Sequence, residues 1–149
     1  MRSYRSLIDN YYPKSKIIFS TLHNEMRYAG PKEAIHHAIM RKNFGCSHII
    51  IGRDHAGVGN YYAPFAAHAI FKEYPDLEIE PIFFPAFYYC TKCAHFANEK
   101  ICPHGSNYKE DLSGTKMRKM FLSGVSPPNH LMRSEVSQII SSYPNPFVD

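Results

Sequence analysis

A run of β-branched residues between two glycines constrains the fold of this chain most. Residues 47–51 read Ser-His-Ile-Ile-Ile, with Gly45 shortly before them and Gly52 directly after them. A strand with apolar side chains on both faces is typical of the interior of a parallel sheet, where helices cover both sides. We therefore expect an α/β fold with an open, Rossmann-like parallel sheet and right-handed connections.

The flanking segments predict further parts of such a sheet. Residues 16–20 form a short apolar run that predicts a first buried strand, and residues 77–84 predict a third, in which Pro81 favours an edge position or a bulge. Gly30-Pro31 is typical of a helix start, and a second helix is expected over about residues 64–74.

The last third of the chain predicts helices. Ser113 or Thr115 is suited to cap a helix that runs to about Leu122. Ser134 is the expected N-cap of a last helix that ends before Tyr143.

Residues 52–60 carry the richest set of polar groups. In parallel sheets ligands bind beyond the carboxyl ends of the strands, where this loop lies. Its glycines allow backbone N–H groups to turn toward an anion, and the planar guanidinium of Arg53 matches the oxygens of sulfate or phosphate. Asp54 is placed to orient that arginine, and His55 to donate to a phosphate oxygen. The alternative is a simple connection in which Arg53 and Asp54 form a local salt bridge.

Three of the four cysteines fall within thirteen residues. Cys90, Cys93 and Cys102 have the spacing of a zinc knuckle, and His104 completes a closed, structural Cys3His site. His95 is the alternative fourth ligand, and reduced, unligated thiols are the alternative to any metal. The remaining Cys46 lies beside the expected strand, where a buried, inert thiol is expected.

Composition narrows the class of protein further. Hydrophobic residues make up 44% and charged residues 20%, with a formal net charge of +4. This balance fits a globular domain, and no basic run favours nucleic acid as a partner. The apolar runs are too short to span a membrane, and no secretory signal is recognised, so a cytoplasmic protein without a membrane partner is expected.

Four blocks of the sequence together resemble the ATP sulfurylases (sulfate adenylyltransferases). They are Met-Arg-Tyr-Ala-Gly-Pro-Lys-Glu-Ala at 26–34, Arg-Lys-Asn-Phe-Gly-Cys-Ser-His at 41–48, Gly-Arg-Asp-His-Ala-Gly at 52–57 and Ser-Gly-Thr-Lys-Met-Arg at 113–118. The third block is highly specific, and the resemblance extends over essentially the whole chain. Some bacterial and archaeal members of that family also carry zinc.

The resemblance implies a nucleotidyltransferase fold and a reaction of sulfate with Mg-ATP that gives adenosine 5'-phosphosulfate and pyrophosphate. It also implies a role for each residue of the loop. Arg53 and His55 are the catalytic candidates. The residues expected around adenosine phosphosulfate are Gly52, Arg53, Asp54 and Ala56. Those expected on the side of the ATP phosphates are His55, Gly57 and Val58.

One departure from the family pattern affects what the chain is expected to do. The family's Gln-x-Arg-Asn segment, its His-x-x-His pair and its N-terminal domain have no counterpart in this sequence. We therefore expect a truncated form or one piece of a longer protein, inactive alone, that forms a homo-oligomer or needs the missing portion. A non-catalytic paralogue and a small zinc-bearing module for nucleic acid or protein interaction are the alternatives.

Within this interpretation we divide the chain into three parts. Residues 1–86 are the partial catalytic domain, residues 87–112 a zinc-knuckle insertion, and residues 113–149 a helical segment that packs on the catalytic domain.

Overall fold

The computed structural model describes residues 1–147, which form two compact units. One unit comprises residues 23–86. The other joins residues 1–22 to the chain that follows residue 86. Each unit has its own sheet and its own buried cluster, so each is described separately.

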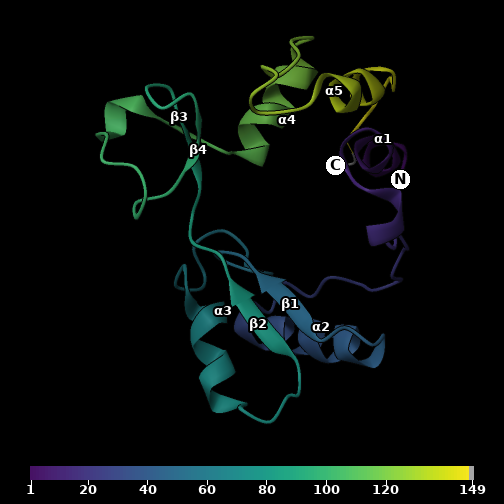
Figure 1. Cartoon of the computed structure of the whole chain (residues 1–149), viewed down its shortest axis with the longest axis vertical. Helices are drawn as coiled ribbons and strands as arrows, with labels where there is room; N and C mark the ends of the chain where they lie inside the picture. Colours follow the sequence, from purple (N-terminus) through teal and green to yellow (C-terminus); the bar gives the residue numbers. More distant parts are fainter. Residues whose placement is uncertain (148–149) are drawn as a thin grey trace. The chain divides into compact units, whose positions relative to one another are not determined.

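The unit of residues 23–86 is built on two parallel strands. Helix α2 (Pro31–Asn43) leads into strand β1 (His48–Ile51), and the chain returns through α3 (Ala66–Ala69) and the 3-10 helix η2 (Ile70–Glu73) to strand β2 (Glu80–Phe83). Figure 1 shows the two parallel arrows of β1 and β2 with α2 and α3 beside them. The α/β class expected from the sequence is confirmed.

The core of this unit lies on one face of the two-stranded sheet. Ile49 and Ile51 of β1 point into it and are buried, while Ile50 between them is 62% exposed. Helices α2 and α3 supply the other side of the cluster. Its buried members are Ala34, Ile35, Ala38, Ile49, Ile51, Ala67, Phe71 and Ile79. In this chain, therefore, helices cover the sheet on the face of Ile49 and Ile51.

Proline and glycine define the start of α2 and the edge of the sheet as expected. Pro31 occupies the first turn of α2, and Gly30 before it has a φ of 53°, a value that favours glycine. Pro81 lies in β2, which pairs only with β1 among the described strands. Pro81 is tolerated there because an edge strand leaves one side of its backbone unpaired.

The first strand expected from the sequence is absent, so that prediction was wrong. The 3-10 helix η1 (Lys14–Lys16) occupies the start of the segment, and Ile18 is 98% exposed. A strand needs hydrogen-bonding partners, and no strand of the described residues pairs with residues 17–20. Helix α1 (Arg2–Tyr11), which precedes it, was not predicted.

The second unit contains a small antiparallel sheet. Strand β3 (Tyr88–Cys90) lies between β4 (His95–Ala97) and β5 (Lys109–Asp111), and the 3-10 helix η3 (Ser106–Tyr108) leads into β5. Its buried cluster consists of Tyr88, Cys90, Ala97 and Cys102. This sheet is the framework that holds the cysteines.

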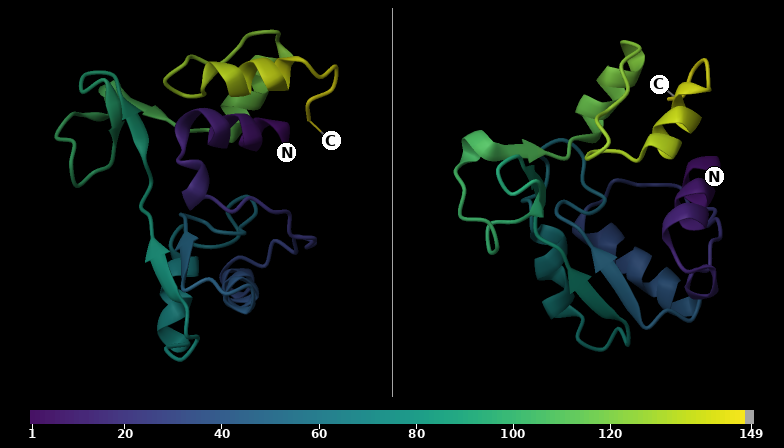
Figure 2. Two further views of the ribbon diagram at one scale, coloured as in Figure 1. Left: turned by 45° about the vertical axis from the view of Figure 1, so that its right-hand side comes forward. Right: turned by 45° about the horizontal axis from the view of Figure 1, so that its top comes forward.

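Helices complete the second unit. Helix α4 (Gly114–Leu122) begins as predicted, with the Ser113 hydroxyl accepting a hydrogen bond from the Lys116 N–H. Helix α5 (Ser134–Ser141) begins one residue before the prediction, since Arg133 and not Ser134 is its N-cap. Helices α1 and α5 lie side by side, as both views of Figure 2 show. No helix among residues 1–147 combines the length and the apolar character needed to cross a membrane.

Candidate functional site

The loop of residues 52–58 begins where strand β1 ends, and two hydrogen bonds attach it to the segment that forms α3. The His68 Nε2 lies 3.2 Å from the Gly52 carbonyl oxygen, and the Asp54 N–H donates to the Pro64 carbonyl at 2.8 Å. His68 in turn stacks on Phe83 of β2 with ring centroids 4.7 Å apart. The backbone at the start of the loop is therefore fixed by its neighbours.

Left-handed backbone conformations give the loop its shape. Asp54 and Ala56 have φ values of 53° and 55°, which non-glycine residues rarely adopt. The Ala56 carbonyl accepts a hydrogen bond from the Gly30 N–H at 2.9 Å, which ties the loop to the start of α2. A Cβ atom at Gly57 would meet the carboxylate of Asp54, so a larger residue there would displace the Asp54 side chain.

The side chains of Glu33, His37 and His55 form a row that connects α2 to the loop, and each is buried or half-buried. The His55 Nε2 lies 3.0 Å from the His37 Nδ1, and the His37 Nε2 lies 3.5 Å from the Glu33 Oε1. Glu33 and His37 are 3% and 5% exposed. Glu33 also accepts hydrogen bonds from the backbone N–H groups of Arg27 and Ala29, each at 2.9 Å. Helix α2 therefore places a buried carboxylate and an imidazole in line behind His55.

The protonation of this row follows from its surroundings. Burial lowers the pKa of both His37 and His55, and the neighbouring Arg41 lowers both further. Burial alone would raise the pKa of Glu33, but the N–H groups of Arg27 and Ala29 outweigh it, and the net shift is downward. At neutral pH the row thus consists of one carboxylate and two neutral imidazoles.

Arg53 is exposed on the loop and forms no ion pair within residues 1–147. The local Arg53–Asp54 salt bridge is therefore not formed, and Asp54 instead lies against Gly57. Val58 is 53% exposed. The guanidinium of Arg53 is unpaired within the described residues, and the loop that carries it has a fixed backbone. This arrangement is suitable for binding an oxyanion.

The three clustered cysteines and His104 come together in the second unit. Their ligand atoms all lie within 4.8 Å of one another. The His104 Nδ1 lies 3.2 Å from the Cys93 Sγ, 3.4 Å from the Cys90 Sγ and 3.6 Å from the Cys102 Sγ. Tetrahedral ligands at usual zinc bond lengths lie about 3.5–3.8 Å apart, so the distances from His104 to the three thiols are close to those of a tetrahedral site.

The electrostatics of the thiols depend on their close approach. Burial, together with the neighbouring thiols of Cys90 and Cys102, raises the pKa of Cys93 to about 11. The backbone N–H of His104 lowers the pKa of Cys102. Three thiols this close together can hold a metal ion, whose positive charge would stabilise all three thiolates.

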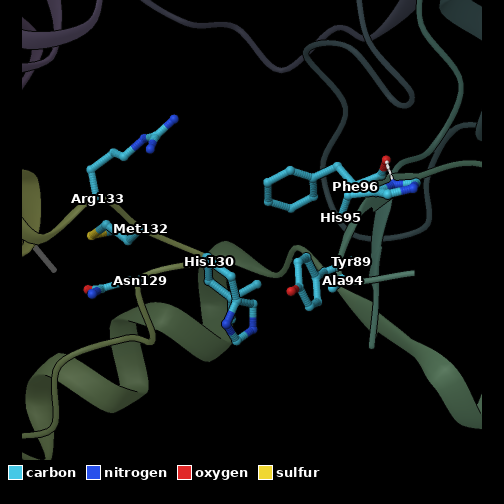
Figure 3. A pocket seen from close by; sticks show the side chains of 9 residues that line it. Tyr89, Ala94, His95, Phe96, Asn129, His130, Met132 and Arg133 are labelled. Carbon is cyan, nitrogen blue, oxygen red and sulfur yellow. Dashed lines mark hydrogen bonds between the residues drawn. The ribbon is translucent and has the colours of Figure 1, made fainter. Parts of the chain in front are cut away.

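His95, the alternative fourth ligand, lies elsewhere. It lines a cavity of about 360 Å³ together with Tyr89, Phe96 and His130. Its Nδ1 lies 2.9 Å from the Phe96 carbonyl oxygen, a contact drawn as a dashed line in Figure 3. Cys46 is exposed, so the prediction of a buried thiol was wrong; the turn before β1 carries it to the surface.

Sequence reasoning assigned no role at the loop to Glu33, His37 or His68. His37 lies in a stretch of α2 with many polar residues, where a histidine is more often solvated or part of the packing than part of a site. The signal that could have identified it is the i, i+4 spacing of Glu33 and His37, which places both on the buried side of α2 with Ala34 and Ala38.

Comparison with known proteins gives a consistent set of relatives. A sequence model of the ATP-sulfurylase family matches residues 1–143. A sulfate adenylyltransferase from Cenarchaeum symbiosum (strain A) is 57% identical over all of this chain, which covers 39% of that relative. Relatives of the same name from Ignicoccus hospitalis and Pyrococcus abyssi are 55% and 54% identical, with the same 39% coverage.

A solved structure also has the same fold. The hexameric APS kinase from Thiobacillus denitrificans matches with a TM-score of 0.63 and 23% identity, over 91% of this chain and 25% of that one. The chain thus spans about two fifths of the length of the curated relatives that it matches.

Proposed function

Because the chain belongs to the ATP-sulfurylase family, we propose that residues 52–58 form the substrate-binding loop of a sulfate adenylyltransferase. In this reaction an oxygen of sulfate attacks the α-phosphorus of Mg-ATP, adenosine 5'-phosphosulfate forms and pyrophosphate leaves. The observation that carries the proposal is the free, exposed Arg53 on a loop whose backbone is fixed at the carboxyl end of β1.

Each residue of the loop has a proposed part. Gly52, Arg53, Asp54 and Ala56 surround the phosphosulfate, and Arg53 neutralises its charge. His55, Gly57 and Val58 lie on the side of the ATP phosphates, which Mg²⁺ accompanies. No covalent intermediate is needed, since positioning and charge stabilisation are the contributions expected of such a site.

The Cys3His cluster is proposed as a structural zinc site. Cys90, Cys93, Cys102 and His104 would fill all four tetrahedral positions and leave none for water. Zinc would then stabilise the three-stranded sheet of short strands around it, whose buried cluster is small.

Activity of the whole enzyme is proposed to need more than this chain. We propose that turnover depends on residues outside the 39% of the relatives that the chain covers, or on partner subunits in a homo-oligomer. We also propose that residues 113–149 pack on residues 1–86. A cytoplasmic location is proposed as well.

Binding of adenosine phosphosulfate to the chain tests the proposal. Titration calorimetry should detect binding to the native chain and a loss of at least about tenfold for Arg53→Ala, because a charge-assisted contact contributes about 1.5–3 kcal/mol. Arg5→Ala is the matched control, since Arg5 is an exposed arginine of helix α1. Equal binding by the native chain and Arg53→Ala would contradict the assignment.

A further inference from the structure

We propose that Glu33 and His37 couple anion binding at the loop to the uptake of one proton by His55. This inference deepens the proposed function and rests on it, because the anion concerned is the phosphate group bound beside His55. It assigns Glu33 and His37 as positioning residues that act on the ligand through His55.

The first step is the position of the proton on His37. Glu33 is ionised and buried, and its Oε1 faces the His37 Nε2 at 3.5 Å. A bare nitrogen lone pair there would face a negative charge in a region of low dielectric, so the His37 proton belongs on Nε2. The amide of Asn24, whose Nδ2 is placed 3.4 Å from the same nitrogen, must then turn its oxygen toward it.

The second step follows from the first. With its proton on Nε2, neutral His37 has a bare Nδ1, which can only accept a hydrogen bond. The His55 Nε2 is 3.0 Å away and must therefore carry the proton of His55. The His55 Nδ1 is then bare. It has no hydrogen-bond partner within residues 1–147 and is not among their fully buried unpaired atoms, so it is at least partly accessible.

The third step concerns the ligand. A bare Nδ1 repels a phosphate oxygen, whereas a protonated Nδ1 donates to it. Binding of an anion beside His55 therefore favours addition of a proton from solvent to Nδ1. The resulting imidazolium donates one N–H to the anion and the other to His37, whose own N–H points to the Glu33 carboxylate. No bond other than this N–H forms, and no group is oxidised or reduced.

The other charged groups around His55 define how strong this coupling is. Arg41 of α2 and His68 of α3 oppose a positive charge on His55, as does His37 when protonated, while Glu33 favours it. On the loop itself Arg53 and Asp54 precede His55. Burial, which has the largest effect on the pKa of His55, and Arg41 keep His55 neutral until an anion arrives, so protonation and binding occur together.

Calorimetry of Mg-ATP binding to the chain of residues 1–149 tests the coupling directly. Mg-ATP is chosen because its phosphates stay ionised near neutral pH, so they contribute few protons. Titrations in buffers of different ionisation enthalpy should give an uptake approaching one proton at neutral pH, with affinity falling by up to about tenfold per pH unit above it. Binding without proton uptake would overturn the inference and leave the proposed function standing.

Two variants identify the source of the coupling. Glu33→Gln removes the charge and should reduce proton uptake by at least half. His36→Gln is the control: it removes the neighbouring, exposed histidine of α2 and should leave uptake unchanged. Equal uptake by Glu33→Gln and His36→Gln would overturn the inference.

Nitrogen NMR of the unliganded chain tests the expected positions of the imidazole protons, even if Glu33→Gln does not fold or Mg-ATP does not bind. The spectra should show His37 and His55 both protonated on Nε2 at neutral pH. A proton on the His55 Nδ1 would overturn the inference. Failure of Mg-ATP to bind at any pH, with the expected tautomers present, would count against the proposed function of the loop instead.

Discussion

The His37 Nδ1 lies 3.0 Å from the His55 Nε2, and this contact joins helix α2 to the loop that follows strand β1. Two segments that are 18 residues apart in sequence thus share one hydrogen-bonded row. The orientation of His55 depends on α2, and so a change within α2 is expected to alter the loop without touching a ligand.

The stability of the chain should depend on pH through this row. The pKa values of His37 and His55 are lowered by burial, so the unfolded chain binds more protons than the folded chain just below the ordinary histidine pKa of about 6.5. The free energy of unfolding should therefore fall as the pH drops below about 6.5. Urea denaturation at a series of pH values measures this effect.

His37→Gln provides the comparison for that experiment. It removes one of the two titrating groups, so its free energy of unfolding should depend less on pH over the same range. His36→Gln should retain most of the dependence, because His36 makes the smallest of the named contributions to the lowered pKa of His37. A pH dependence that is identical in both variants would show that the buried histidine is not its source.

The Cys3His cluster of the second unit is predicted to bind zinc. We predict one zinc ion per chain, and loss of that ion in Cys90→Ser, Cys93→Ser and Cys102→Ser. Cys46→Ser should retain it, because Cys46 is exposed and separate from the cluster. Elemental analysis of the purified variants measures the zinc content.

The fourth zinc ligand can be tested in the same way. His104→Ala should weaken zinc binding, because the His104 Nδ1 lies within 3.6 Å of all three thiols. His95→Ala should bind zinc as the native chain does. The opposite pattern, with zinc lost only from His95→Ala, would require a different set of ligands.

Gly57→Ala should disturb the loop by a steric collision. The added methyl group would meet the carboxylate of Asp54, and rotation of that side chain out of the way is expected to cost about 0.5–1.5 kcal/mol. Gly52→Ala is the control for stability, because a Cβ atom there has open space around it. Thermal unfolding of both variants should separate them, and equal midpoints would contradict the packing described for Asp54.

Those parts of the fold that depend on local sequence could be predicted. The β-branched run of β1, the Gly-Pro start of α2 and the Ser113 cap of α4 each have a short-range physical signal. The grouping of three cysteines with His104 was also accessible, because the spacing of the ligands alone brings them within reach of one metal ion.

The elements that were missed depend on contacts between distant segments. Helix α1 has no side-chain cap, and it packs on α5 through the Tyr11 hydroxyl, which donates to the Glu135 carboxylate at 2.9 Å. The apolar run near Ile18 has the composition of a strand but no strand to pair with among the described residues. The spacing of Glu33 and His37 indicates that His37 is buried, but its contact with His55 joins two elements and could not be read from the sequence.

The most direct test of the loop assignment is ATP formation from adenosine phosphosulfate and pyrophosphate. Residues 1–149 would replace the aligned segment of the Cenarchaeum symbiosum relative, which is 57% identical over that length. We predict turnover by this chimera and a loss of at least about tenfold for its Arg53→Ala variant, with the zinc content of both unchanged. A folded, zinc-loaded chimera whose rate is the same with and without Arg53 would contradict the assignment of residues 52–58 as the substrate-binding loop.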